Sequence, residues 1–372
     1  MKISLNTAYT VNRHIKEYKQ HNQSQKRTSC YQSHNNPCNA VVPVLSFQAK
    51  PDSVMLLAQT DKLRCAYSGE KMLSPYMFRS ICAKLSKKNN AQSAINFLKE
   101  YQEYMPTVET EIFDMFTEYS NGGKKTLQDI LLQEHPKALT RLREKQRNVL
   151  ISSDENINML DKDIAEEVLG IRDAALIGIE DGTFSRHKLL ERLKIINSQD
   201  ARTKHLLNNI YAKWYTLPRS YMDYDAFIVK YSKFPHEEIA QRLLSMSVAT
   251  VEHIKPYAKG GKDHLWNYAL VCRLYNTDKE DMNLSEYNEL NPEIGIQKNL
   301  LKYINNISNE IEKGNKYFEV NYLYPKQLGQ NIFLETGWKE FNEINDDMRN
   351  FRNTPKLTGS KKGNNRYITN HK

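Results

Sequence analysis

The chain has 372 residues, 40% of them hydrophobic, which is enough for two or three units that each bury a core. No apolar run approaches the roughly 18 residues that a membrane-spanning helix needs, which excludes a membrane partner. The net charge of +9 and an isoelectric point near 9.0 favour a polyanionic partner.

The first 45 residues are polar and rich in Asn, Gln, Ser, Lys and His, without the charged start and apolar core of a secretory signal. We expect residues 1–45 to be disordered, with Cys30 and Cys38 incidental there. The chain holds five cysteines, an odd number without regular pairing, which predicts reduced thiols in a cytoplasm. Export through a noncanonical signal is the alternative to a cytoplasmic location.

A turn-forming unit and a long helical region follow. Residues 46–75 contain the sequence CAYSG from Cys65, and we expect a hairpin there. Residues 76–246 carry apolar side chains at helical spacing, which predicts packed helices. The predicted helices span residues 78–105, 108–119, 126–150, 156–169, 184–196 and 204–215.

Three cations in this region share one helical face. Lys137, Arg141 and Lys145 follow one another every fourth residue, so their side chains lie on the same side of a helix. That face could lie along a phosphate backbone. The alternative is an ordinary solvated surface, because Glu134 and Glu144 lie close by.

The segment 211–224 interleaves aromatic side chains with Lys213 and Arg219. Such a pattern can stack nucleobases. Aromatic residues are more often part of a core, and core packing is the expectation here.

The most specific pattern is VEHIKPYAKGGKDHLWNYALVCRLYNTDKEDM at residues 251–282. A β-branched run that ends in Glu252 and His253 predicts a strand. Pro256 and a Gly-Gly pair predict a loop, YALVC predicts a second strand, and the polar run from about Leu274 predicts a helix. We expect the strands to form a hairpin with the helix packed across it.

In that arrangement the end of the first strand lies beside the first turn of the helix, so Glu252 and Asn276 can face one point. Oxygen ligands with open positions suit Mg²⁺. His253 points to the opposite face of the strand, because side chains alternate. A base and a cation are what phosphodiester hydrolysis needs. Taken singly, these residues would form only a surface turn and loops.

The joint pattern resembles the HNH, or ββα-metal, endonuclease family, in the variant with an acidic residue before the His and a final Asn. The resemblance implies that His253 is the general base and that Asn267 pins the loop through side-chain hydrogen bonds. It also implies that Glu252, where the family often has Asp, and Asn276 hold Mg²⁺ or Mn²⁺. Lys279 matches a basic position after the last ligand.

The family resemblance also implies nucleic-acid contacts. Lys279 and Lys255 are expected to contact phosphate, with double-stranded DNA as the partner. The face formed by Lys137, Arg141 and Lys145 is a further candidate for binding DNA.

Many HNH domains brace the hairpin with zinc held by two Cys-x-x-Cys pairs. Here Cys65 and Cys272 stand at the first positions, but Ser68 and Tyr275 replace the second members. Because a structural zinc needs four ligands, we predict a degenerate zinc knuckle without zinc, in which hydrogen bonds and packing replace the metal bonds.

Two alternatives to this degenerate knuckle stay open. Cys82 or His264 could supply the missing zinc ligands. The CAYSG sequence, taken alone, would be an ordinary β-turn.

The predicted fold class is therefore α+β. Its parts are an HNH core from residues 46–75 and 247–285, a large α-helical insertion at 76–246, a C-terminal helical extension at 286–351 and a disordered basic tail at 352–372. Within the extension we expect a helix over 292–313, a weak strand over 317–324 and a helix over 338–351.

The predicted function is metal-dependent hydrolysis of phosphodiester bonds in DNA. Two alternatives are an inactive HNH fold that binds nucleic acid or a protein, and an RNA-cutting toxin or effector that uses the same site.

Overall fold

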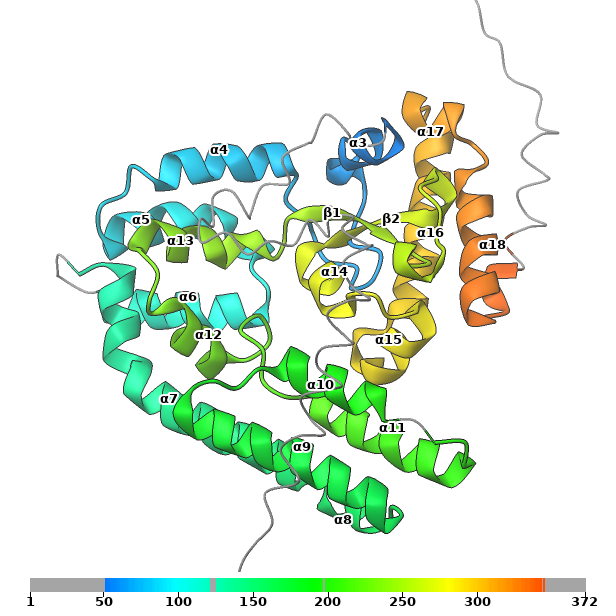
Figure 1. Cartoon of the computed structure of the whole chain (residues 1–372). Helices are drawn as coiled ribbons and strands as arrows, with labels where there is room; N and C mark the ends of the chain where they lie inside the picture. Colours follow the sequence, from blue (N-terminus) through cyan, green and yellow to red (C-terminus); the bar gives the residue numbers. More distant parts are fainter. Residues whose placement is uncertain (1–50, 121–124, 197, 343, 345–372) are drawn as a thin grey trace, which may run out of the picture. The chain divides into compact units, whose positions relative to one another are not determined.

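The computed structural model describes residues 51–120, 125–196, 198–342 and 344 (Figure 1). These residues belong to a compact unit that spans Leu45–Lys372. The segments 1–45 and 352–372, predicted to be disordered, lie outside the described residues, and the helix predicted over 338–351 extends beyond them.

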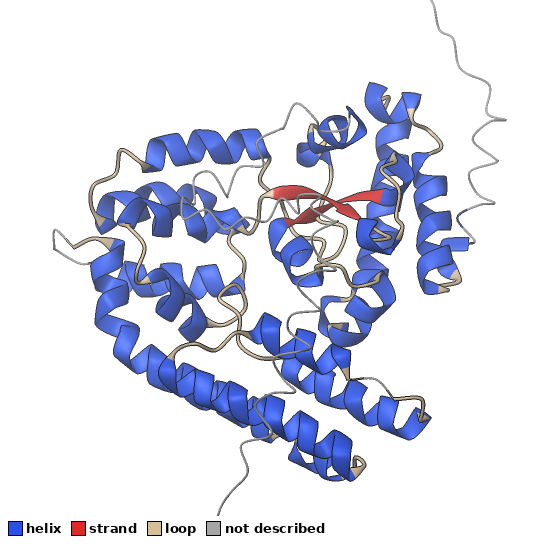
Figure 2. Cartoon of the chain, viewed as in Figure 1, coloured by secondary structure: helices blue, strands red, loops and turns tan. Residues whose placement is uncertain are grey.

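The described residues are mainly helical, with a two-stranded antiparallel sheet (Figure 2). Strand β1 (Ala249–His253) pairs with β2 (Tyr268–Cys272), so that Glu252 lies opposite Ala269 and His253 opposite Tyr268. Helix α14 (Arg273–Lys279) follows β2 directly. This composition agrees with the α+β class, and the strand, loop, strand and helix predicted for 247–285 are all present.

The insertion predicted at residues 76–246 is built from helices. They are α4 (Pro75–Leu85), α5 (Ala91–Leu98), η2 (Lys99–Tyr104), α6 (Thr107–Tyr119), α7 (Leu127–Ile151), α8 (Asp154–Asn158), α9 (Lys162–Asp181), α10 (Arg186–Ile195), α11 (Ala201–Tyr215), α12 (Tyr224–Tyr231) and α13 (His236–Ser245).

Two of the long predicted helices are interrupted. The prediction for 78–105 is wrong because the chain leaves α4 after Leu85 and starts again at α5, where the side chain of Asn90 accepts a hydrogen bond from the backbone N–H of Ser93. This cap satisfies a free N–H of the new helix and favours a start there over continuation. The helix predicted over 156–169 is likewise divided between α8 and α9.

The hairpin predicted over 46–75 is wrong for the described residues. Residues 51–62 form α3 (Pro51–Leu57) and η1 (Thr60–Lys62), and a turn at Cys65–Gly69 follows. Leu73 then makes an isolated parallel bridge to Val248, at the edge of β1. Backbone groups of this segment thus pair both within the turn, where the Cys65 N–H donates to the carbonyl of Glu70, and with the later sheet.

These long-range contacts complete a sheet that would be marginal alone, because an isolated two-stranded hairpin is barely stable in water. On the β2 edge, the Ala66 N–H donates to the carbonyl of Leu270 at 2.8 Å, and the Tyr303 hydroxyl accepts from the Leu270 N–H at 3.1 Å. On the β1 edge, the Ala249 N–H donates to the carbonyl of Leu73 at 2.8 Å.

The C-terminal extension is helical. Its elements are α15 (Leu284–Leu290), η5 (Pro292–Ile294), α16 (Ile296–Glu312), α17 (Lys316–Val320) and α18 (Tyr324–Thr336). The strand predicted over 317–324 is wrong. Asn315 caps α17 by accepting from the Tyr317 N–H, and Phe318 alone of that helix is buried. Helices α16 and α18 lie side by side, and α18 contacts the segment just before β2.

Candidate functional site

Helix α14 covers the face of β1 that carries Thr250 and Glu252. The Asn276 amide donates to the Thr250 hydroxyl at 3.1 Å, and the Lys279 ammonium donates to Glu252 Oε1 at 2.6 Å. The start of α14 is held to the chain just before β1, since the Arg273 N–H donates to the carbonyl of Val248 at 2.9 Å. This bond satisfies one of the N–H groups that every helix start leaves free.

Glu252 and Lys279 form a buried ion pair. Lys279 is 0% exposed and Glu252 only 5%, and the ammonium also donates to the carbonyl of His253 at 3.3 Å. Burial raises the pKa of the Glu252 carboxyl, and the charge of Lys279 opposes that rise. The expectation that Lys279 contacts phosphate is therefore corrected: its side chain points into the protein, where it balances the charge of Glu252.

His253 lies on the opposite face of the hairpin from Glu252, as the strand period requires. Its Nε2 is 3.0 Å from Asp263 Oδ1, which also accepts a hydrogen bond from the Tyr268 hydroxyl at 3.1 Å. The Tyr268 ring meets the imidazole edge-on, with centroids 5.0 Å apart. The side chain of His253 remains 29% exposed. With Nε2 held by the carboxylate, Nδ1 is the ring nitrogen left for a reacting group.

Asp263 was not among the residues predicted for the site. It comes ten positions after His253, inside a loop whose path the sequence does not specify. A carboxylate in that loop is an ordinary solvated residue until the folded loop brings it to the imidazole.

Asn267 is fully buried and joins both ends of that loop. Its Oδ1 accepts from the Lys255 N–H at 2.9 Å, and its Nδ2 donates to the carbonyls of Lys255 and Lys262 at 3.0 Å each. The closed loop needs Gly261, because a Cβ there would lie 1.9 Å from the carbonyl oxygen of Lys255. The loop-pinning bonds that the resemblance implied for Asn267 are present.

Helix α18 supports the same loop from outside. The Asn331 amide donates to Asn267 Oδ1 at 2.9 Å, and Glu335 forms an ion pair with Lys255 at 3.1 Å. Asn331 and Glu335 are one helical turn apart and so share a face of α18. Sequence reasoning missed both residues. Lys255, predicted to contact phosphate, keeps 38% of its side chain exposed.

The predicted ligands carry the donor types that a hard cation prefers. Glu252 and Asn276 offer carboxylate and amide oxygens, the ligand types that Mg²⁺ takes alongside retained waters. The nearby Tyr67 hydroxyl is buried without a partner among the described residues, and burial together with the charge of Glu252 raises the pKa of Tyr67. Buried polar groups normally have partners, so the Tyr67 hydroxyl is an unsatisfied polar group close to the Glu252 carboxylate.

Within the described ranges, no cluster of three or more His, Cys, Asp or Glu residues could hold a metal ion. The two predicted metal ligands, Glu252 and Asn276, would not count as such a cluster, because the second of them offers an amide oxygen. No family model, curated protein or solved structure matches the chain. The described helices include none that is long and apolar enough to cross a membrane.

The four residues predicted to form the degenerate knuckle come together. The Cys272 N–H donates to Cys65 Sγ at 3.2 Å, although 207 residues separate them. Ser68 and Tyr275 both donate to Glu70 Oε2, at 2.9 and 3.3 Å. Glu70 thus joins the two halves by hydrogen bonds, and sequence reasoning missed it. Neither Cys82 nor His264 completes a cluster of metal ligands with them in the described part of the chain.

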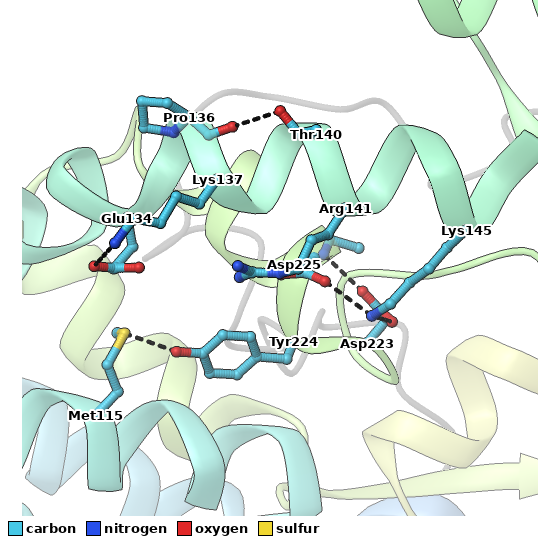
Figure 3. A network of polar contacts seen from close by, with 11 residues as sticks. Met115, Glu134, Pro136, Lys137, Thr140, Arg141, Lys145, Asp223, Tyr224 and Asp225 are labelled. Atoms are coloured by element: carbon cyan, nitrogen blue, oxygen red, sulfur yellow. Dashed lines mark hydrogen bonds and ion pairs between the residues drawn. The ribbon is translucent and has the colours of Figure 1, made fainter.

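The cationic row on α7 faces carboxylates (Figure 3). Arg141 forms an ion pair with Asp225 at 2.7 Å, and Lys145 contacts Asp223 at 2.7 Å and Asp225 at 2.9 Å. Lys137 lies 3.6 Å from Glu134. The phosphate-binding expectation is corrected for Arg141 and Lys145, because Asp225 of α12 and the capping Asp223 pair with them, whereas the Lys137 side chain stays 71% exposed. Arg141 and Lys145 join α7 to α12.

The aromatic segment before α12 is chiefly core, as expected. Trp214 and Tyr215 are buried, and the Tyr215 hydroxyl donates to Asp278 Oδ2 at 3.0 Å. Asp278 lies on α14 between Asn276 and Lys279, and it also accepts from two further tyrosines and pairs with Arg219. The helical insertion is therefore bonded to the helix that carries the proposed metal ligand.

Proposed function

We propose that the chain is a metal-dependent HNH endonuclease, with a ββα-metal core, that hydrolyses phosphodiester bonds of DNA. The observation that carries the proposal is the pairing of His253 with Asp263 on one face of the β1–β2 hairpin, while Glu252 lies on the other face under α14. An imidazole oriented by a carboxylate, on a strand whose preceding residue offers a carboxylate oxygen on the other face, is suited to activating water for attack on phosphorus.

In this mechanism His253 Nδ1 accepts a proton from the attacking water. Asp263 holds the imidazole through Nε2 and stabilises the positive charge that the ring then carries. Asn267 keeps the loop that carries Asp263 closed.

Glu252 and Asn276 would hold Mg²⁺ or Mn²⁺. When bound, the ion supplies charge stabilisation for the departing 3′ oxygen. The Lys279 ammonium donates to Glu252 Oε1 and opposes the rise that burial causes in the pKa of this carboxyl.

The direct test uses the purified full chain and supercoiled plasmid DNA, with Mg²⁺ or with EDTA. We expect nicking or linearisation with Mg²⁺ alone, and a fall of about 10²–10⁴-fold for His253→Ala. His205→Ala is the matched control, because His205 lies exposed on α11. Cleavage by His253→Ala at the unaltered rate would refute the assignment. RNA offered in parallel distinguishes an RNA-cutting toxin or effector.

The second candidate function is a nucleic-acid-binding or protein-binding module that uses the same fold without catalysis. The buried pair between Glu252 and Lys279 favours it, because an ammonium group already neutralises the proposed metal ligand. This alternative predicts DNA retardation in a gel but no cleavage with Mg²⁺ or Mn²⁺. It also predicts that His253→Ala leaves the retardation unchanged.

A further inference from the structure

Cys65 and Cys272 form a buried thiol pair between two distant parts of the chain. Cys65 begins the turn that ends at Gly69, and Cys272 ends β2 and caps the start of α14. The two side chains are hydrogen-bonded to each other, and the Cys272 N–H lies 3.2 Å from Cys65 Sγ. Both are free cysteines.

The backbone around the pair is already joined. The Ala66 N–H, next to Cys65, donates to the carbonyl of Leu270 at 2.8 Å, two residues before Cys272. A disulfide requires Cβ atoms about 3.5–4.5 Å apart and a favourable dihedral angle. The two side chains are in hydrogen-bond contact and Cys65 Sγ lies 3.2 Å from the Cys272 nitrogen, so the fold brings both sulfurs into one small region.

The two thiols differ in their ease of ionisation. Burial alone disfavours a thiolate, but hydrogen bonds from Cys272 and Ser68 outweigh it and lower the pKa of Cys65 to about 7. The hydrogen bond to Cys65, together with burial, raises the pKa of Cys272. Cys65 is therefore the thiol of the two that ionises more easily, and the thiolate is the form that reacts with oxidants.

A polar route connects the pair to solvent. Ser68, hydrogen-bonded to Cys65, is only half-buried, and its hydroxyl reaches the exposed carboxylate of Glu70 at 2.9 Å. Ser68 is therefore the partly exposed side chain past which a small oxidant such as hydrogen peroxide would approach the sulfur.

We propose that Cys65 and Cys272 are an oxidation site at which hydrogen peroxide forms a reversible disulfide across the degenerate knuckle. The Cys65 thiolate attacks one peroxide oxygen, the O–O bond breaks, and hydroxide leaves as the sulfenic acid forms. The Cys272 sulfur then attacks the sulfenic sulfur and loses its proton, and water leaves as the S–S bond forms. Two thiols are oxidised and one peroxide is reduced to two waters.

The disulfide would join the turn at Cys65 to the N-terminus of α14, where one covalent bond takes over the bracing role of Glu70. Because α14 carries Asn276, the cross-link lies four residues from a proposed metal ligand. The proposal does not depend on nuclease activity, since it concerns the two sulfurs alone.

The test treats the full-length protein with hydrogen peroxide and maps its peptides without reduction. We expect a mass loss of about 2 Da and a cross-linked peptide pair containing Cys65 and Cys272, both reversed by dithiothreitol. A Cys30→Ser/Cys38→Ser background removes the cysteines outside the described residues, and Cys82→Ser is the matched control that should leave the cross-link intact.

Single variants test the order of the steps. Cys272→Ser should stop at the sulfenic acid of Cys65, a gain of about 16 Da that dimedone traps, whereas Cys65→Ser should lose both products. Recovery of Cys65 and Cys272 as separately alkylated thiols after peroxide treatment overturns the proposal, as does their irreversible oxidation without a cross-link. The peptide map of the otherwise unaltered protein decides the matter even where a variant fails to fold.

Discussion

Removing the ammonium of Lys279 should expose the cost of burying Glu252. Lys279→Met keeps the length and apolar stem of the side chain but leaves a buried carboxylate without its counter-ion. Both residues are more than nine-tenths buried, so solvent screens the pair little. Breaking a buried pair on one side typically costs about 3–5 kcal/mol, and we expect a loss of that size in the free energy of unfolding.

The matched control is Lys259→Met. Lys259 pairs with Glu286 at 2.8 Å, but 36% and 51% of the two side chains are exposed. Exposed pairs contribute below about 1 kcal/mol, so this variant should unfold near the unaltered midpoint. The measurement is urea unfolding followed by circular dichroism, with Glu252→Gln and the Glu252→Gln/Lys279→Met double variant in the same series. The double variant should recover part of the loss, with a coupling energy of about 1–3 kcal/mol.

The pH dependence has a definite sign. Burial raises the folded-state pKa of Glu252, so the carboxyl stabilises the fold most below its ordinary pKa and progressively less as the pH rises. Without Lys279 that pKa rises further, and the deficit of Lys279→Met should be larger at about pH 8 than at about pH 5. A deficit that equals the Lys259→Met control, or that does not change with pH, would refute this account of the buried pair.

Three further predictions follow from the loop and the insertion. Gly261→Ala should destabilise the fold and lower any cleavage activity, because the added Cβ would overlap the carbonyl of Lys255. The control is Gly170→Ala in α9, where no atom lies within 4 Å of the added Cβ, and this variant should be more stable by about 0.5–1 kcal/mol. Equal melting temperatures for the two variants would contradict this reasoning. Asn267→Ala leaves buried loop groups unpaired and should cost about 1–3 kcal/mol in urea unfolding. Asp278→Ala leaves the Arg219 guanidinium without its carboxylate partner and should lower the free energy of unfolding by about 3–5 kcal/mol. A loss below about 1 kcal/mol in Asn267→Ala or in Asp278→Ala would contradict the role given to that residue.

Local chemistry explains what could be predicted of the site. The β-branched run before His253, the Gly-Gly loop and the apolar run before Cys272 each favour one backbone conformation, so the order of strand, loop, strand and helix follows from neighbouring residues. Alternation along β1 then puts Glu252 and His253 on opposite faces. The failures also have local causes: the cap at Asn90 divides a predicted helix, and apolar residues around Phe318 suit a short helix as well as a strand.

The sequence did not reveal the ion-pair partners of the charged side chains. The row that includes Arg141 reads as a free cationic face until α12 places Asp225 against it. Lys279 reads as a surface lysine until α14 turns it toward Glu252. The spacing of charged residues along a helix does not identify their counter-ions, because these come from segments that are distant in the sequence.

The sequence by itself determined the hairpin-and-helix unit, and its family resemblance implied the buried anchor at Asn267 and the meeting of the two knuckle halves around Cys65 and Cys272. Only the tertiary structure decided that Asp263 holds His253 and that Glu70 joins the knuckle halves. The physical reason is that backbone conformation responds to neighbouring residues, whereas the direction of a side chain and its partner depend on how remote segments pack around it.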